Sequence, residues 1–130
     1  YLIRQRQGDD NSLGVMKFNF SNKYDVYMHD TNARSMFGRS NRALSHGCVR
    51  VQKWDSLSHY LITKDPRPIP EDSLKAWLVR QEKHYISMKQ KVPVYLRYYT
   101  CEVKDDGKIQ FFDDIYGEDK ELRMRYFVKK

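Results

Sequence analysis

The most informative segment of this chain is SHGCVRV at residues 45–51, in which Cys48 stands two positions after His46. A second histidine, His29, precedes Cys48 by nineteen positions. A cysteine attacks carbon only as its thiolate, and a nearby imidazole or helix amino terminus lowers the pKa of a thiol from about 8.5. Gly47 permits backbone geometry that a side chain would obstruct. The segment therefore predicts an activated thiol nucleophile at Cys48.

Two other interpretations begin from the same residues. Free cysteines are among the most buried residues of proteins, so Cys48 would also suit a purely structural position. Thiolate and imidazole are common zinc ligands, so His29, His46 and Cys48 would also suit a zinc site. The segment alone leaves these interpretations open beside the nucleophile.

Upstream of this segment the sequence predicts two strands and a long loop. Apolar and polar residues alternate over residues 15–20, as in a half-buried strand, and residues 21–23 follow as a turn. Residues 24–28 predict a second strand, which presents His29 at its end. Polar residues and glycine dominate residues 30–45, so we expect a long loop there, of the kind that often carries function.

Downstream of this segment the sequence predicts two helices. Apolar side chains recur at helical spacing over residues 54–62, and Asp65 with Pro66 ends that helix. After a proline-rich connector, residues 74–82 predict a second short helix. Cys48 is therefore expected shortly before a helix.

The C-terminal third predicts a hairpin and a last helix. Residues 92–103 are rich in residues that favour strands, and residues 105–107 are a strong turn signal before a second strand at 108–112. The charged tail, residues 119–130, suits a closing helix. Because no glycine-rich turn joins a strand to a helix, we exclude a dinucleotide fold and expect a strand-dominated α+β domain.

Composition limits the class of protein. A chain of 130 residues is long enough for one domain with one hydrophobic core. A hydrophobic content of 40% and an aromatic content of 14% exclude a disordered chain. The net charge of +7 favours partners that carry carboxylates, phosphates or anionic lipid. The positive residues form no run of five or more, so we expect no nucleic-acid partner.

The sequence shows no recognisable targeting segment. No stretch approaches the roughly 18–20 apolar residues of a membrane span, and residues 1–10 contain no apolar signal-peptide core. The chain begins without Met inside an apparently structured segment. We therefore expect a piece of a longer protein, with targeting and any membrane attachment in an upstream segment. Cys101 is expected to be a buried free thiol, because pairing with Cys48 would block the nucleophile.

The order of motifs resembles a known family. His29-Asp30-Thr31, followed after thirteen residues by Ser45-His46-Gly47-Cys48, resembles the signature of the L,D-transpeptidase catalytic (YkuD-type) domain. Nearly the whole chain resembles the large members of that family, in which the active site is capped. The further segments that carry the resemblance are Arg4–Gly8, Asn11–Gly14, Lys17-Phe18, Tyr27-Met28, Phe37, Pro93–Tyr95, Asp105–Gly107 and Asp114–Tyr116.

The resemblance implies a fold and a place within it. The family's catalytic domain is a mixed β-sandwich with peripheral helices, and it starts many residues earlier than this chain. Residues 1–130 are therefore expected to be the C-terminal portion of a single catalytic domain, without its N-terminal strands. Strands that lack their partners would have unpaired edges.

The resemblance also implies a two-step acyl transfer without cofactor or metal. Cys48 attacks an L,D amide in the donor peptide stem of peptidoglycan, expels D-alanine and forms a thioester. An amine of the acceptor stem then takes the acyl group and forms a 3-3 cross-link. Water as the acceptor would instead give an L,D-carboxypeptidase or peptidoglycan hydrolase. Such an enzyme acts in the cell envelope, in the periplasm, and carbapenems are expected to acylate its cysteine.

Roles for individual residues follow from the same resemblance. His29 is expected to be the general base, oriented by the backbone carbonyl of Asp30 rather than by a third side chain. His46 and Gly47 would shape the nucleophile turn. The N–H groups of Cys48 and Gly47 are expected to stabilise the oxyanion.

Three more residues are candidates for substrate binding: Arg50, Tyr27 and Ser45. The guanidinium of Arg50 would suit either a substrate carboxylate or the support of its own loop. Tyr27 would suit either substrate contact or packing within its strand. A non-catalytic cell-wall-binding module remains the last alternative, and in it Cys48 would be dispensable.

Overall fold

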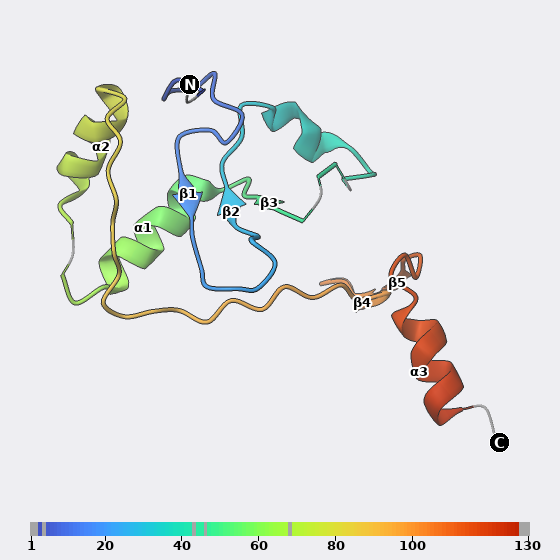
Figure 1. Ribbon diagram of the computed structural model, residues 1–130. Helices are drawn as coiled ribbons and strands as arrows, with labels where there is room; N and C mark the ends of the chain where they lie inside the picture. The colour runs from blue at the N-terminus through green and yellow to red at the C-terminus, as the bar shows by residue number, and fades with distance from the viewer. Residues whose placement is uncertain (1–2, 4, 43, 46, 68, 128–130) are drawn as a thin grey trace. The chain divides into compact units, whose positions relative to one another are not determined.

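A computed structural model describes residues 3, 5–42, 44–45, 47–67 and 69–127. The chain forms two compact units that divide after residue 93, and each unit has its own small sheet (Figure 1). Five short strands and three α-helices are found among the described residues, which confirms the predicted α+β class.

The first sheet has the strand order β1-β2-β3 and consists of β1 (Lys17–Phe18), β2 (Met28–His29) and β3 (Val49–Arg50). β1 pairs antiparallel with β2, whereas β3 pairs parallel with β2. Parallel neighbours need a crossover connection, which residues 30–48 provide. Both predicted upstream strands are therefore present, and His29 ends the second of them as predicted.

Both of these strands are shorter than the sequence pattern predicts, and Asn22 supplies a reason. Its side-chain amide donates to the carbonyl oxygens of Phe20 at 3.0 Å and Val26 at 2.7 Å, and its oxygen accepts the N–H of Val26 at 3.0 Å. Asp25 has a φ of 52°, in the left-handed region that strands exclude. Side-chain hydrogen bonds thus replace ladder hydrogen bonds around this turn.

The crossover between β2 and β3 contains a 3-10 helix, η1 (Arg34–Gly38). Thr31 Oγ1 accepts the N–H of Ala33 at 3.1 Å, and Arg34 Nε donates to the Thr31 carbonyl oxygen at 3.3 Å. Thr31 is 1% exposed. The first half of the predicted loop is therefore anchored on a buried residue.

The two predicted helices of the first unit are present. α1 (Trp54–Lys64) ends at Asp65, which is extended because Pro66 disfavours helical geometry in the residue before it. α2 (Glu71–Val79) ends earlier than predicted. Gln81, with a φ of 54°, departs from the right-handed helix and stops it.

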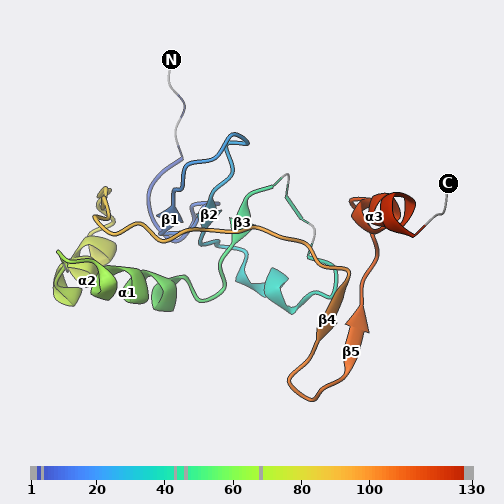
Figure 2. The same cartoon turned by 90° about the horizontal axis from the view of Figure 1, so that it is seen from below.

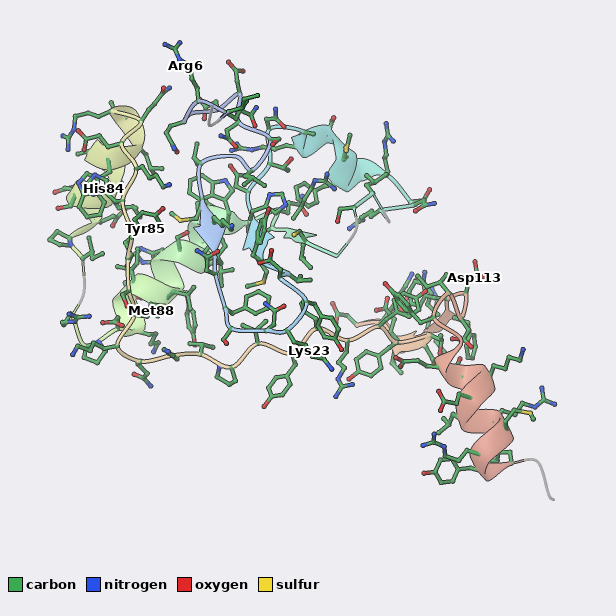
Figure 3. The ribbon with its side chains drawn as sticks, in the orientation of Figure 1. Arg6, Lys23, His84, Tyr85, Met88 and Asp113 are labelled. Atoms are coloured by element: carbon green, nitrogen blue, oxygen red, sulfur yellow. The ribbon has the colours of Figure 1, made fainter. Side chains whose placement is uncertain are left out.

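The segment after α2 returns past the end of α1, where Asp65 holds it. Asp65 Oδ2 accepts the N–H groups of Lys89 at 2.6 Å and Gln90 at 3.3 Å, and Oδ1 accepts the N–H of Arg67 at 3.0 Å. These hydrogen bonds, that of Arg67 foremost, lower the pKa of Asp65. One carboxylate thus joins the end of α1 to the returning segment. Figure 3 shows, along this segment, the side chains of His84, Tyr85 and Met88.

The second unit is a hairpin followed by a helix, as predicted (Figure 2). β4 (Cys101–Val103) and β5 (Ile109–Phe111) pair antiparallel across a turn in which Gly107 has a φ of 78°. Only the last three residues of the predicted first strand pair. α3 (Glu118–Tyr126) follows. Cys101 is free but exposed, so the prediction of a buried thiol is wrong: all three residues of β4 are exposed.

The buried side chains of the described part of the chain are polar. None of its hydrophobic residues is fully buried, and the buried polar residues are His29, Asp30, Thr31, Ser58 and Asp65. The prediction of one hydrophobic core is therefore wrong for these residues, because strands of two or three residues cannot cover large apolar side chains. The predicted dominance of strands is wrong for the same residues, since more of them lie in helices. No helix of this part is long and apolar enough to cross a bilayer.

Candidate active site

Strand pairing brings several predicted site residues onto one face of the first sheet. Directly opposite residues share a face, and side chains alternate along each strand. His29 lies opposite Lys17 on β1 and opposite Arg50 on β3. Tyr27 and Cys48 precede His29 and Arg50 by two residues, and the N–H of the residue after Cys48 donates to the Tyr27 carbonyl oxygen at 3.0 Å. We call these five residues the site face.

Cys48 lies at the end of a tight turn. Ser45 Oγ donates to the Cys48 carbonyl oxygen at 2.7 Å. Gly47 has a φ of 136°, which other residues rarely adopt, and a Cβ there would lie 3.3 Å from Val26 Cγ2. His46 lies outside the described residues. The free, half-buried thiol leads directly into β3, and α1 begins shortly after it, at Trp54, as expected from the sequence.

His29 is buried, and its ring is fixed on one side. Nδ1 contacts the carbonyl oxygen of Asp30. A carbonyl oxygen only accepts hydrogen bonds, so Nδ1 carries the proton and Nε2 keeps its lone pair. The ring centroid lies 5.7 Å from that of Tyr27. This tautomer has the free lone pair that a general base requires.

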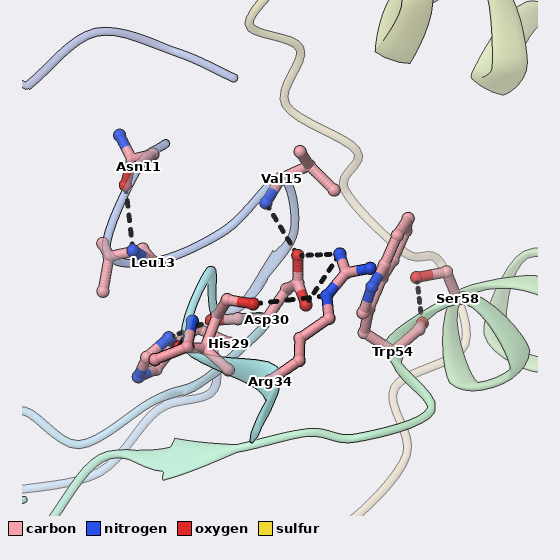
Figure 4. A network of polar contacts seen from close by, with 10 residues as sticks. Asn11, Leu13, Val15, His29, Asp30, Arg34, Trp54 and Ser58 are labelled. Atoms are coloured by element: carbon pink, nitrogen blue, oxygen red, sulfur yellow. Dashed lines mark hydrogen bonds and ion pairs between the residues drawn. The ribbon is translucent and has the colours of Figure 1, made fainter. Parts of the chain in front are cut away.

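The carboxylate of Asp30 has partners of its own. Asp30 is 1% exposed, and its Oδ2 accepts the N–H of Val15 at 3.1 Å and lies 3.2 Å from Arg34 Nη2 (Figure 4). Gly14, with a φ of 62°, packs so closely that a Cβ there would overlap this carboxylate. The contact with His29 is therefore made by the Asp30 backbone, while the side chain anchors the neighbouring loops.

The contacts of the Tyr27 side chain on the site face are the ones that the sequence predicts least. Its hydroxyl lies within hydrogen-bonding reach of Cys48, and burial followed by the charge and hydrogen bond of Cys48 raises the pKa of Tyr27. Lys17 Nζ lies 3.6 Å from the centroid of the Tyr27 ring, as in a cation–π contact. The contact with Cys48 depends on the parallel pairing of β2 and β3, which no local sequence pattern encodes.

A hollow of about 210 Å³ opens beside Cys48. η1 contributes Met36 and Phe37 to its wall, and Cys48 and Arg50 line it from the sheet. Arg50 Nε is buried and has no hydrogen-bond partner among the described residues. An unpaired guanidinium donor beside a nucleophile suits an anionic group. The other lining residues are Arg42, Leu44, Ser45 and Val49.

Metal binding has no support among the described residues, where no three His, Cys, Asp or Glu side chains gather closely enough to hold an ion. The zinc alternative needs His46, which lies outside them, so it stays a hypothesis.

Comparison with known proteins identifies the family of this chain. The family model of the L,D-transpeptidase catalytic domain (YkuD) matches residues 1–70, which include both His29 and Cys48. The chain therefore belongs to the family of L,D-transpeptidase catalytic domains. It is 36% identical over 124 residues to a protein of Haemophilus influenzae named "Putative L,D-transpeptidase". That match covers 95% of this chain and 24% of the relative, so the chain spans about a quarter of the relative's length.

Proposed function

We propose that this chain carries the nucleophile and general base of a peptidoglycan L,D-transpeptidase that forms 3-3 cross-links. The observation that supports this most is the parallel pairing of β2 and β3, which puts His29 and Cys48 on one sheet face. The contact of His29 Nδ1 with the Asp30 carbonyl oxygen leaves Nε2 free to accept the thiol proton.

In the first step, Cys48 Sγ attacks the carbonyl carbon of the L,D amide in the donor stem, and His29 takes the thiol proton. Collapse of the tetrahedral intermediate breaks the C–N bond. D-alanine then leaves as an amine that receives the proton from His29, and a thioester remains on Cys48. No cofactor or metal takes part in this proposal.

In the second step, the side-chain amine of the acceptor stem attacks the thioester and gives its proton to His29. The C–S bond breaks, the acyl group passes to the amine, and the thiolate recovers a proton from His29. Water in place of the amine would yield a shortened stem and make the protein an L,D-carboxypeptidase. The two outcomes share every residue of the site, so the product alone separates them.

The turn around Cys48 suits stabilisation of the oxyanion. Donors in fixed positions lower the cost of charge that develops on the carbonyl oxygen. We assign this role to the N–H groups of Cys48 and Gly47, and we assign the shaping of the turn to Gly47 and His46. Ser45 supports the same turn, because its hydroxyl is already engaged with the Cys48 carbonyl oxygen.

We propose that Arg50 binds a carboxylate of the donor stem in the hollow beside Cys48. Its buried Nε lacks a partner among the described residues, and a guanidinium binds carboxylates in a two-point geometry. Tyr27 borders the same thiol and would contact the bound stem there. A net charge of +7 also suits stems that carry free carboxylates.

We further propose that residues 1–130 form the C-terminal portion of one catalytic β-sandwich that acts in the periplasm. Many large apolar side chains of the described residues are exposed, as expected of a layer that packs against further strands. Membrane attachment, where present, would belong to a segment outside these residues.

The decisive experiment is the intact mass of the full-length protein after incubation with a disaccharide tetrapeptide. We expect an acyl adduct on wild type and on the control variant Cys101→Ala, and none on Cys48→Ala. A product that contains two stems would identify a transpeptidase, and a tripeptide alone would identify the carboxypeptidase. An adduct on Cys48→Ala would refute the proposal. Stem binding without an adduct on any variant would favour the cell-wall-binding module.

Carbapenems offer a second test of the same nucleophile. Their strained amide presents an acyl group to a thiolate, so we expect covalent addition at Cys48. This reaction should not require peptidoglycan. Mass spectrometry of the carbapenem-treated protein should show one adduct, lost in Cys48→Ala and retained in Cys101→Ala. An unchanged wild-type mass would contradict this prediction.

A further inference from the structure

The carboxylate of Asp30 is an unusual group for its position. It is 1% exposed and follows directly after His29. A buried carboxylate is costly unless it is paired and hydrogen-bonded. Here Oδ2 accepts the N–H of Val15 at 3.1 Å, and Arg34 Nη2 lies 3.2 Å from Oδ2 and 3.5 Å from Oδ1. The backbone carbonyl of the same residue contacts His29 Nδ1.

Arg34 connects this carboxylate to the wall of the hollow. It is the first residue of η1, which supplies Met36 and Phe37 to that wall. Its Nε also donates to the carbonyl oxygen of Thr31 at 3.3 Å, and Thr31 is 1% exposed. The Arg34 guanidinium therefore contacts both Asp30, whose carbonyl oxygen touches His29, and Thr31, which precedes η1 (Figure 4).

Gly14 restricts the carboxylate from the other side. With a φ of 62°, it brings its backbone so close to Asp30 that a methyl group there would overlap Oδ2. The Asp30 side chain thus has a rigid wall on one side and a guanidinium on the other. Its backbone, including the carbonyl oxygen, is fixed as a consequence.

We infer that Arg34 is a positioning residue, whose ion pair with Asp30 holds the Asp30 carbonyl against His29 and η1 against the hollow. This inference rests on the proposed roles of His29 and Cys48. Loss of the pair would let the Asp30 peptide rotate, so that Nδ1 loses its acceptor and the ring loses its tautomer and orientation. The base and the substrate-facing wall would then be disturbed together.

The test uses the rate of Cys48 alkylation by iodoacetamide as a function of pH, in the full-length protein with Cys101→Ala as background. Alkylation reports on the thiolate and needs no peptidoglycan chemistry. The charged and titratable groups of the site face that surround His29 and Cys48 are Lys17, Tyr27 and Arg50, and the variants leave all three unchanged. Arg34→Gln removes the charge, Arg34→Lys keeps it, and Arg39→Gln is the matched control on the same segment.

We expect Arg34→Gln to move the pH midpoint of alkylation and to slow acylation by the stem about tenfold or more, within the usual contribution of a general base. Arg34→Lys should recover most of the acylation rate, and Arg39→Gln should match wild type. Asp30→Asn combined with Arg34→Gln should be no slower than the slower single variant, because both changes break one pair.

A wild-type midpoint and acylation rate for Arg34→Gln would overturn the inference, as would a double variant whose loss is the product of the single losses. If Arg34→Gln fails to fold, the decision falls to Asp30→Asn, which breaks the same ion pair and for which a wild-type midpoint and acylation rate would likewise overturn the inference. Failure of the proposed function appears differently: wild type itself would then form no stem adduct, while the alkylation profiles would still rank the variants.

Discussion

Tyr27 lies beside Cys48 because β3 runs parallel to β2, and its ring also touches Lys17 and His29. Burial, followed by the charge and hydrogen bond of Cys48, raises the pKa of this phenol, so Tyr27 stays protonated and can donate to a thiolate at Cys48. From sequence, His29, Asp30 and Cys48 were proposed as site residues by motif, since residue type and spacing indicate their chemistry. The Tyr27 contact has no such signal, because it depends on pairing between distant segments.

Removal of the Tyr27 hydroxyl should make the thiolate harder to form. A hydrogen bond to a charged group contributes roughly 1.5–3 kcal/mol, and a half-buried site favours the lower end, which corresponds to about one pH unit. We therefore expect Tyr27→Phe to raise the pH midpoint of Cys48 alkylation by about that amount. Tyr24→Phe is the control, since Tyr24 is 73% exposed on the same segment. Equal midpoints for the two variants would contradict the role of the hydroxyl.

Among the elements, α1 and the hairpin of β4 and β5 were predicted well, because helical spacing and a turn signal are local properties. The strands around Asn22 were predicted too long. The alternating pattern was correct, but the Asn22 side chain and the left-handed Asp25 take the backbone out of the ladder. η1 was not predicted, since its anchor is the tertiary burial of Thr31.

The Asp65 hydrogen bonds that join the end of α1 to the returning segment should weaken as the pH falls. In the folded protein the pKa of Asp65 is lowered, chiefly by the hydrogen bond from the Arg67 N–H. The carboxylate therefore stabilises the fold above its ordinary pKa, and this stabilisation is lost as the pH falls through the lowered value. We expect Asp65→Asn to speed amide exchange over residues 84–91 at neutral pH, with the difference from wild type shrinking in acid. Hydrogen-exchange mass spectrometry measures this.

Asp9→Asn serves as the matched control, because Asp9 is an exposed aspartate of the same unit. It should exchange like wild type over residues 84–91 at every pH. A difference between Asp65→Asn and wild type that persists undiminished in acid would show that the carboxylate charge is not the cause.

At the scale of the whole molecule, the class was predictable and the packing was not. Composition gives enough apolar residues for a core, yet among the described residues Tyr95, Phe111 and Phe127 are all more than two-thirds exposed. Composition counts apolar side chains but does not state which surfaces meet. The resemblance to a larger domain predicts further strands that would cover these side chains, and this stays a prediction.

The parallel pairing of β2 and β3 has a consequence for how such a site diversifies. His29 and Cys48, the proposed base and nucleophile, are held by backbone ladder bonds, whereas the long connection between them forms the wall of the hollow. Replacements or insertions in that connection can alter which molecules are admitted while the reacting pair stays in register. Substrate selection and the proposed acyl-transfer chemistry therefore depend on separate segments of the chain, so substitutions can change one without changing the other.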